Sequence, residues 1–187
     1  MAVQSSADIA TALAFAQVHN IRVVIKSSGH EFQGRSTAAN ALLLWTRTLR
    51  GVTINPSFSA CPGDAPVPAI SAMPGNNWGE VYNMLNGSGF EVVGGSARSV
   101  SACGGYTLGG GHSWMSPVHG LAVDNVLAYT AVLANGTVVT ASHCSSADLF
   151  WALRGGGGGT FAVVTSVTYR LHPVSTTGVI GLTIVVG

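Results

Sequence analysis

The sequence predicts a fold that mixes helices with strands. The chain has 187 residues, of which 47% are hydrophobic and 8% are charged, so it has enough apolar material to bury a core. A segment with helical spacing at 6–20 precedes an apolar run at 21–25, an order that is typical of an α/β lobe. The dipeptide Asn135-Gly136 separates two further apolar runs and predicts a hairpin. The length suits one domain, built as one unit or as two small lobes.

The first third of the chain alternates between helical and extended patterns. Apolar residues recur at helical spacing through 6–20, and Ser6 can cap this helix. Proline and glycine make 61–68 a surface loop. Short apolar runs predict three strands, the first of them buried, at 21–25, 41–45 and 51–54.

The second helix has clear signals at both ends. Asn77 can cap it, Trp78, Val81 and Leu85 form its apolar stripe, and Gly87 can end it. The chain then enters a strand at 90–93.

The remaining elements follow the hairpin signal. The hairpin strands are expected at 126–134 and 137–141, with positive φ at both turn residues. Ser145 opens a helix that Gly155 closes. Large residues alternate with smaller or polar ones through 160–171, which predicts a long half-buried strand. A further strand is expected at 179–186.

The low charge excludes several classes of protein. Eight Lys+Arg and seven Asp+Glu residues form no basic run, which argues against electrostatic nucleic-acid binding. The long uncharged stretch between Arg98 and Asp124 is broken by glycines and Pro117, so we expect no transmembrane helix. Asp8 interrupts the apolar core that a signal peptide would need.

Three cysteines, Cys61, Cys103 and Cys144, allow at most one internal disulfide, and the sequence leaves the pairing open. None lies in a C-x-x-C pair, so no zinc site is predicted. Glycosylation sequons at Asn86 and Asn135 give weak support for a secreted protein.

Three glycine-rich segments, at 27–34, 94–111 and 155–159, adjoin predicted strands. Glycine lets a ligand approach the main chain closely, and clustered N–H groups bind anions without formal charge. The alternative is that these glycines only make tight turns. No P-loop, no G-x-G-x-x-G and no G-x-S-x-G motif is present.

Individual candidates each have two interpretations. His30 follows a predicted strand and can serve as a base, ligand or nucleophile, or only as a hydrogen-bonding loop residue. Arg98 can contact a phosphate or remain solvated surface. Tyr106 is expected to pack rather than to act as an acid, and Cys103 to be a small buried residue. His112 and His119 are not expected to bind a metal.

Four ordered motifs carry a family resemblance. They are IKSSGHEFQGRS at 25–36, GGSARSVSACGGYTLGGGHS at 94–113, GLAVDNV at 120–126, and DLFWALRGGG with GTF at 148–161. Together they resemble the berberine-bridge-enzyme-like FAD-linked oxidases of the vanillyl-alcohol-oxidase / p-cresol-methylhydroxylase (PCMH) superfamily. The similarity runs from about residue 2 to residue 173 and is most like the fungal members.

The resemblance implies an α+β fold, the PCMH-type FAD-binding fold of two α+β subdomains with FAD between them. Residues 1–173 would form this domain with its first strand curtailed, and 174–187 would begin a substrate domain that the chain lacks. His30 stands where the family's histidine bonds covalently to the flavin. The residues implied to bind the cofactor are Lys26, Ser27, Ser28, Gly29, His30, Glu31, Gly34, Gly94, Gly95, Ser96, Arg98, Ser99, Ser101, Ala102, Gly104, Gly105, Gly111, Val123, Gly159, Phe161 and Val163.

The implied function is that of the FAD-binding module of an oxidoreductase. The whole enzyme would oxidise a small alcohol, sugar or alkaloid-like substrate by hydride transfer to flavin, with O2 as acceptor. Bicovalent members carry a second flavin-linking Cys where we align Arg98, so a single bond is expected. No catalytic base is assigned, no metal, nucleic-acid or membrane partner is expected, and the full-length protein is expected in the secretory pathway. The alternative is a non-catalytic nucleotide-binding protein without the substrate domain.

Overall fold

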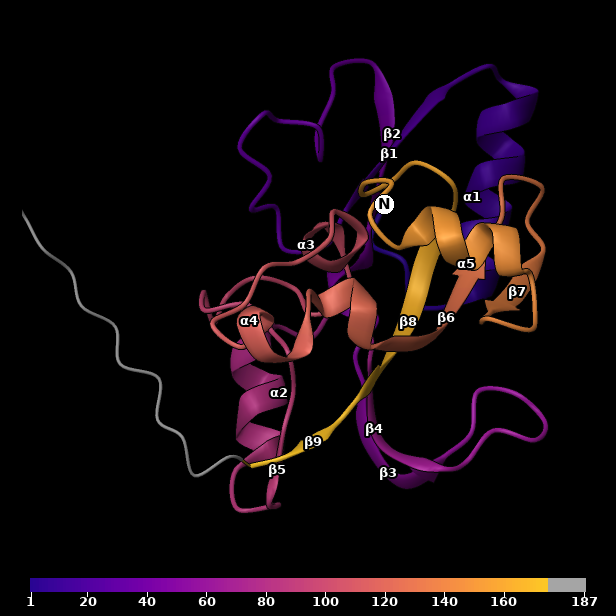
Figure 1. Ribbon diagram of the computed structural model, residues 1–187. Helices are drawn as coiled ribbons and strands as arrows, with labels where there is room; N and C mark the ends of the chain where they lie inside the picture. The colour runs from indigo at the N-terminus through magenta and orange to yellow at the C-terminus, as the bar shows by residue number, and fades with distance from the viewer. Residues whose placement is uncertain (175–187) are drawn as a thin grey trace, which may run out of the picture.

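The computed structural model describes residues 1–174 and places a five-stranded antiparallel sheet at the centre of the fold (Figure 1). The strand order is β3-β4-β8-β6-β7. Their bounds are Val52–Phe58, Val67–Ala72, Val163–Arg170, Val126–Val132 and Val138–Ala141, respectively. The strand expected at 179–186 lies outside the described residues.

The central strand β8 is more buried than its sequence pattern predicts. It pairs with β4 through Ala72 and Val167, and with β6 through Val132 and Val163. Of its eight residues only Ser166 and Arg170 are not buried. The prediction of a half-buried strand was wrong because both faces of this strand are covered. Side chains that point to either face are therefore buried in the core.

The N-terminal segment forms a small lobe above one end of this sheet (Figure 1). It contains helix α1 (Ser6–Val18) and a parallel pair of strands, β1 (Arg22–Lys26) and β2 (Ala41–Trp45). The short 3-10 helix η1 (Thr46–Thr48) follows. A separate cluster of buried residues joins this lobe to β6 and β8: Val3, Ile9, Ala12, Leu44, Leu49, Val132 and Val163.

Two details of this lobe correct the sequence analysis. The cap of α1 is Ser5, not Ser6, because the Ser5 hydroxyl accepts a hydrogen bond from the Asp8 N–H at 3.1 Å. Strand β1 was expected to be buried, but only Val24 is. Val23 and Ile25 pack against the core of this lobe but stay only partly buried.

We call the five-stranded sheet and the helices packed on it the second lobe. The larger core lies between this sheet and these helices. These helices are α2 (Trp78–Leu85), α3 (Gly105–Leu108), α4 (Ser116–His119), η2 (Ala122–Asn125) and α5 (Ala147–Leu153). Asn77 caps α2 as predicted, and Glu80 bonds back to the Asn77 N–H. Trp78 is fully buried and packs against the rings of Tyr82, Tyr106 and Tyr169.

Several predicted bounds and one turn differ from the structure. The strand expected at 51–54 is longer, since β3 extends to Phe58, and β4 begins at Val67, within the loop expected at 61–68. The strand expected at 90–93 is shorter, since β5 (Phe90–Glu91) pairs only with the two residues of β9 (His172–Pro173). Helix α5 begins at Ala147 rather than at Ser145. The β6–β7 turn has positive φ at Gly136 only, because it spans 133–137 with Leu133 N bonded to Thr137 O. A longer turn of this kind needs one left-handed residue rather than two.

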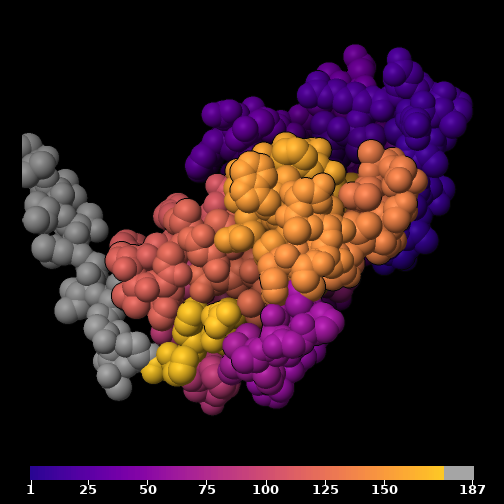
Figure 2. Space-filling model, turned by 45° about the vertical axis from the view of Figure 1, so that its right-hand side comes forward, coloured from indigo at the N-terminus to yellow at the C-terminus, as the bar shows by residue number. Residues whose placement is uncertain are grey.

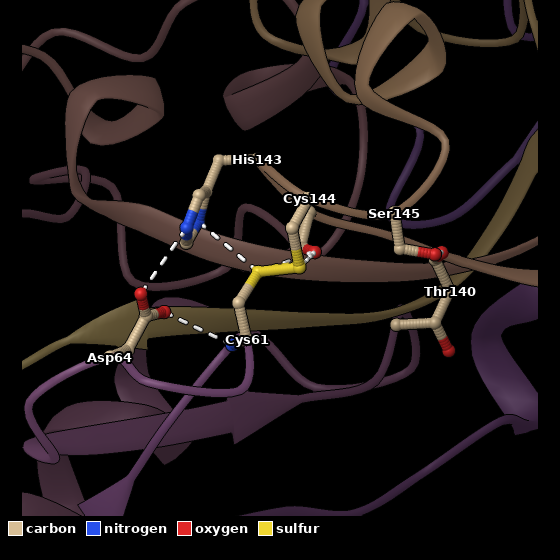
Figure 3. Close-up of a disulfide and its surroundings, with 7 residues drawn as sticks. Cys61, Asp64, Thr140, His143, Cys144 and Ser145 are labelled. Atoms are coloured by element: carbon tan, nitrogen blue, oxygen red, sulfur yellow. Dashed lines mark hydrogen bonds and ion pairs between the residues drawn. A yellow bond between two sulfur atoms is a disulfide. The ribbon is translucent and has the colours of Figure 1, made fainter.

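A disulfide joins Cys61 to Cys144 and leaves Cys103 as a buried free thiol (Figure 3). It ties the loop between β3 and β4 to the segment between β7 and α5, 83 residues apart in sequence. His143 lies beside the bridge, with Nδ1 at 3.5 Å from Cys61 Sγ and Nε2 at 3.3 Å from Asp64 Oδ1. Within residues 1–174, no helix combines the length and apolar character needed to cross a membrane.

Candidate functional site

A cavity of about 560 Å³ lies where the N-terminal lobe meets the second lobe. Figure 2 shows the N-terminal residues, in indigo and violet, against the orange and yellow segments of the second lobe. The cavity is lined by parts of three segments, 25–36, 100–109 and 156–164, together with Thr46 and Pro74. These segments include parts of all three glycine-rich loops of the sequence, so the structure brings the loops together.

The first loop leaves strand β1 and turns sharply at a glycine. Gly29 has φ +83°, and a Cβ at this position would lie 2.6 Å from Lys26 Cε. Only glycine adopts this conformation without strain. The turn brings His30 to the cavity. His30 lies in the loop that follows β1, and its side chain is exposed.

His30 is held by the second glycine-rich loop. Its Nε2 lies 3.0 Å from Ser99 Oγ, 69 residues along the chain. In the tautomer with hydrogen on Nε2, the ring donates to Ser99 and Nδ1 keeps its lone pair. The imidazole therefore has one nitrogen engaged by protein and one available for a ligand.

Glu31 and Arg35 close the same loop on itself. The carboxylate of Glu31 accepts hydrogen bonds from Arg35 N at 2.7 Å and from Arg35 Nε at 2.9 Å. The pKa of Glu31 lies below its ordinary value, mainly because the main-chain N–H of Arg35 donates a hydrogen bond to the carboxylate. Ionised Glu31 thus fixes the shape of the loop after His30.

Serine hydroxyls join the first loop to the second across the cavity. Ser28 Oγ accepts from Ser101 N at 3.1 Å, and the buried Ser101 hydroxyl donates to Pro74 O at 2.9 Å. A Cβ on Gly104 would lie 2.5 Å from Ser27 Oγ. The serine side chains of the first loop therefore lie against the main chain of the second, and a Cβ at position 104 would collide with Ser27.

The third loop touches the second in the same way. A Cβ on Gly158 would lie 3.0 Å from the Cα of Gly105. Gly157 and Gly159 have φ of +102° and +68°, so the loop turns through conformations that favour glycine. The cavity wall therefore includes glycines from all three loops, beside serine hydroxyls and apolar side chains. Among the lining residues, only His30 and Arg35 are basic.

Tyr106 and Cys103 complete the wall as neutral groups. Burial raises the pKa of Tyr106 to about 12, and its hydroxyl donates to His112 O while its ring packs edge-on against Trp78. Burial also raises the pKa of the Cys103 thiol. Tyr106 packs and Cys103 is buried, as expected from the sequence.

Nine of the predicted site residues line this cavity: Ser27, Ser28, Gly29, His30, Glu31, Ser101, Gly104, Gly105 and Gly159. Ser99 is joined to it through His30. Lys26 is adjacent, because its side chain lies against Gly29. The others, which do not line it, are Gly34, Gly94, Gly95, Ser96, Arg98, Ala102, Gly111, Val123, Phe161 and Val163.

Several of these other residues have structural contacts instead. A Cβ on Gly94 would lie 2.5 Å from the Trp78 ring, and one on Gly111 would lie 2.7 Å from Ala122 Cβ. Val123 O accepts from Arg154 Nε at 2.9 Å. These positions support the packing behind the loops.

Arg98, which the sequence left open between phosphate and solvent, contacts helix α2. Its Nη2 donates to Asn83 Oδ1 at 2.8 Å and to Gly79 O at 3.3 Å. Its guanidinium therefore ties the second glycine-rich loop to α2. No local pattern marks Asn83 as its partner.

Sequence reasoning also missed lining residues. Phe32, Gln33, Arg35 and Ser36 lie within the first motif, and 156–158 within the third loop, so those segments were flagged although the residues were not. At the start of β8, Ala162 and Val164 line the cavity while Phe161 and Val163 do not. Successive side chains of a strand point to opposite faces, so this alternation could be predicted once it is known which face lines the cavity.

A second cavity of about 430 Å³ lies near the disulfide. Its lining includes Asp64, His143, Phe150, Arg154 and Arg170, and none of the predicted site residues. Arg154 is paired with Asp124 at 3.6 Å. The cavity between the lobes is therefore the stronger candidate, because three separate loops converge on it.

Comparisons with known proteins show which family the chain resembles. Residues 1–142 match the family described as FAD binding domain. The chain is 45% identical over 170 residues to the VAO-type flavoprotein oxidase VAO615 of Thermothelomyces thermophilus, covering 91% of this chain and 29% of that protein. It is 45% identical over 177 residues to the FAD-linked oxidoreductase sthB of Phaeosphaeria nodorum, covering 94% and 55%. The chain thus spans between about a third and about half of these relatives.

Solved structures share the fold. The VAO-type flavoprotein MtVAO615 from Myceliophthora thermophila has a TM-score of 0.87 at 45% identity, covering 91% of this chain and 31% of that one. The 6-hydroxy-D-nicotine oxidase from Arthrobacter nicotinovorans has a TM-score of 0.80 at 29% identity, covering 91% and 35%. A glucooligosaccharide oxidase from Acremonium strictum has 0.78 at 28%, covering 92% and 34%. These similarities bear out the expected fold of two α+β subdomains.

The contact between the first two loops can be tested with neighbouring glycines. Gly104→Ala should lower the free energy of unfolding by about 1–3 kcal/mol, because its methyl group collides with Ser27. Gly105→Ala is the matched control, since a Cβ there meets no atom within 4 Å, and it should change stability by less than about 0.5 kcal/mol. Denaturant unfolding of the two variants measures the difference. Equal stabilities would contradict the close approach of these loops.

Proposed function

The chain belongs to the FAD binding domain family, which its residues 1–142 match, and we propose that the cavity between its two lobes holds the FAD. The convergence of three glycine-rich loops on one cavity is the observation that carries this proposal. Its volume lies within the usual range for small-molecule sites. We extend the domain to residue 173, where the family resemblance ends.

The wall of the cavity suits a dinucleotide. A diphosphate can be bound by clustered main-chain N–H groups and hydroxyls without formal cations. Gly104 and Gly158 stand where a Cβ would collide with another loop, so at these two positions the main chain is not covered by a side chain of its own. Ser27, Ser28 and Gly105 would contact the diphosphate, with Arg35 as the nearest cation of the lining.

His30 is the residue that we propose bonds covalently to the flavin. Its Nε2 is engaged by Ser99 Oγ at 3.0 Å, so in the tautomer with hydrogen on Nε2 the free lone pair is on Nδ1. The related glucooligosaccharide oxidase is described as carrying 6-S-cysteinyl, 8α-N1-histidyl FAD. For this chain we propose one bond, through His30, because the free thiol of Cys103 is buried and its pKa is raised.

The whole protein is proposed to be an FAD-dependent oxidoreductase. When bound, the flavin would accept a hydride from a small organic substrate such as an alcohol, sugar or alkaloid-like molecule, with O2 as the acceptor. The names of the relatives, VAO-type flavoprotein oxidase and FAD-linked oxidoreductase, support this reaction class. Nothing in the described residues favours the alternative of a non-catalytic nucleotide-binding protein.

The site of covalent attachment follows from peptide mapping. After the chain is loaded with FAD and denatured, trypsin should place the flavin on peptide 27–35, which contains His30. His30→Ala should lose all flavin on denaturation yet bind FAD reversibly, because the loops remain. His112→Ala is the control, since His112 does not line the cavity. Flavin on the Cys103 peptide would refute the assignment.

Ser99 is proposed to position His30. Ser99→Ala removes a hydrogen bond worth about 0.5–1.5 kcal/mol, so covalent attachment should slow by up to roughly tenfold. Reversible FAD affinity should stay the same, since Ser99 does not line the cavity. Ser99→Thr keeps the hydroxyl and should restore the rate. The time course of acid-stable flavin measures this, and an unchanged rate in Ser99→Ala would contradict the role of Ser99.

A further inference from the structure

The turn between β6 and β7 presents a chemical motif that the cofactor site does not use. Residues 135–137 are Asn-Gly-Thr, an acceptor sequence for N-linked glycans. Asn135 and Thr137 are exposed. No residue of 133–137 lines the cavity between the lobes, and the turn lies beside α1, with Gly136 facing Ala10 (Figure 1).

The conformation of this turn orients the acceptor amide. Asn135 Oδ1 accepts a hydrogen bond from Thr137 N at 3.0 Å, which is the local Asx turn that asparagine forms with the residue two positions on. Gly136 adopts φ +83° and donates to Leu133 O at 2.9 Å. Within residues 1–174, Asn135 Nδ2 makes no hydrogen bond. The amide is thus held by its oxygen with its nitrogen toward solvent.

The other acceptor sequence, at 86–88, is arranged differently. Ser88 N donates to Leu85 O at 3.0 Å rather than to the Asn86 side chain. The Ser88 hydroxyl accepts a hydrogen bond from Phe90 N at 3.2 Å. Asn86 is exposed at the end of α2, but its side chain does not form the Asx turn found at Asn135, since Ser88 N bonds to Leu85 O instead.

The disulfide supplies an independent observation about the compartment. Cys61 and Cys144 are bonded across 83 residues (Figure 3). Disulfides form and persist in oxidising environments such as the lumen of the secretory pathway. N-linked glycans belong to secreted and surface proteins. The bridge and the acceptor motif therefore point to the same compartment.

We propose that Asn135 is a site of N-linked glycosylation, and that it is preferred over Asn86. The co-substrate is a lipid-linked oligosaccharide diphosphate. The Asn135 Nδ2 would bond to the anomeric carbon of the first sugar and lose a proton, while the bond from that carbon to the lipid diphosphate breaks. No oxidation or reduction is involved. The proposal is independent of FAD binding, because neither asparagine lines the cavity.

The test is secretion of the full 187-residue chain from a yeast, directed by a heterologous leader. Peptide N-glycosidase converts a glycosylated asparagine to aspartate, so peptide mapping with and without the enzyme measures the occupancy of each site and separates it from spontaneous deamidation at Asn-Gly. Occupancy at Asn135 should be high and should exceed that at Asn86. Thr137→Ala should abolish it, Thr137→Ser should retain it, and Asn86→Gln should leave it unchanged.

The wild-type map decides the outcome even if Thr137→Ala is not secreted. Secreted wild-type chain with Asn135 recovered as unmodified asparagine would overturn the proposal. Occupancy at Asn86 equal to or above that at Asn135 would overturn the preference that the turn geometry implies.

Discussion

The close approach of three main-chain segments is the constraint on which the site depends. Gly104 lies against Ser27, and Gly158 lies against Gly105, so closely that a Cβ on either glycine would collide with its neighbour. These contacts bring the end of β1 to the segments before α3 and β8. The hydrophobic cluster that contains Leu44, Val132 and Val163 also joins the N-terminal lobe to the sheet. This cluster, the glycine contacts and the Ser28–Ser101 bond together determine how the lobes meet around the cavity.

The composition of the chain follows from this arrangement. A wall lined mainly by glycines, hydroxyl groups and apolar side chains contains few charges, and it agrees with a content of only 8% charged residues. The few charges near the loops have structural partners, such as Glu31 with Arg35 and Arg98 with Asn83. His30 is different, because its partner Ser99 comes from the other lobe. The contact between the two lobes therefore also orients the imidazole of His30.

Much of this fold could be predicted from local patterns. Capping by Asn77, the hairpin at Gly136 and the strand at 41–45 depend on neighbouring residues, and these predictions were accurate. The burial of β8 and the exposure of β1 were mispredicted because they depend on which elements cover each strand. The loops of the site were flagged by their glycines and by the family motifs. The Arg98–Asn83 contact and the lining by Thr46 and Pro74 depend on tertiary packing, which no local pattern reports.

Amide hydrogen exchange with and without FAD tests the central claim most directly. The account predicts slower exchange in the three glycine-rich loops, at 27–34, 94–111 and 155–159, and no change in the turn at 133–137. NAD at the same concentration should leave the three loops unchanged. Protection confined to the residues around Asp64, His143 and Arg154, or protection of the loops by NAD alone, would contradict it.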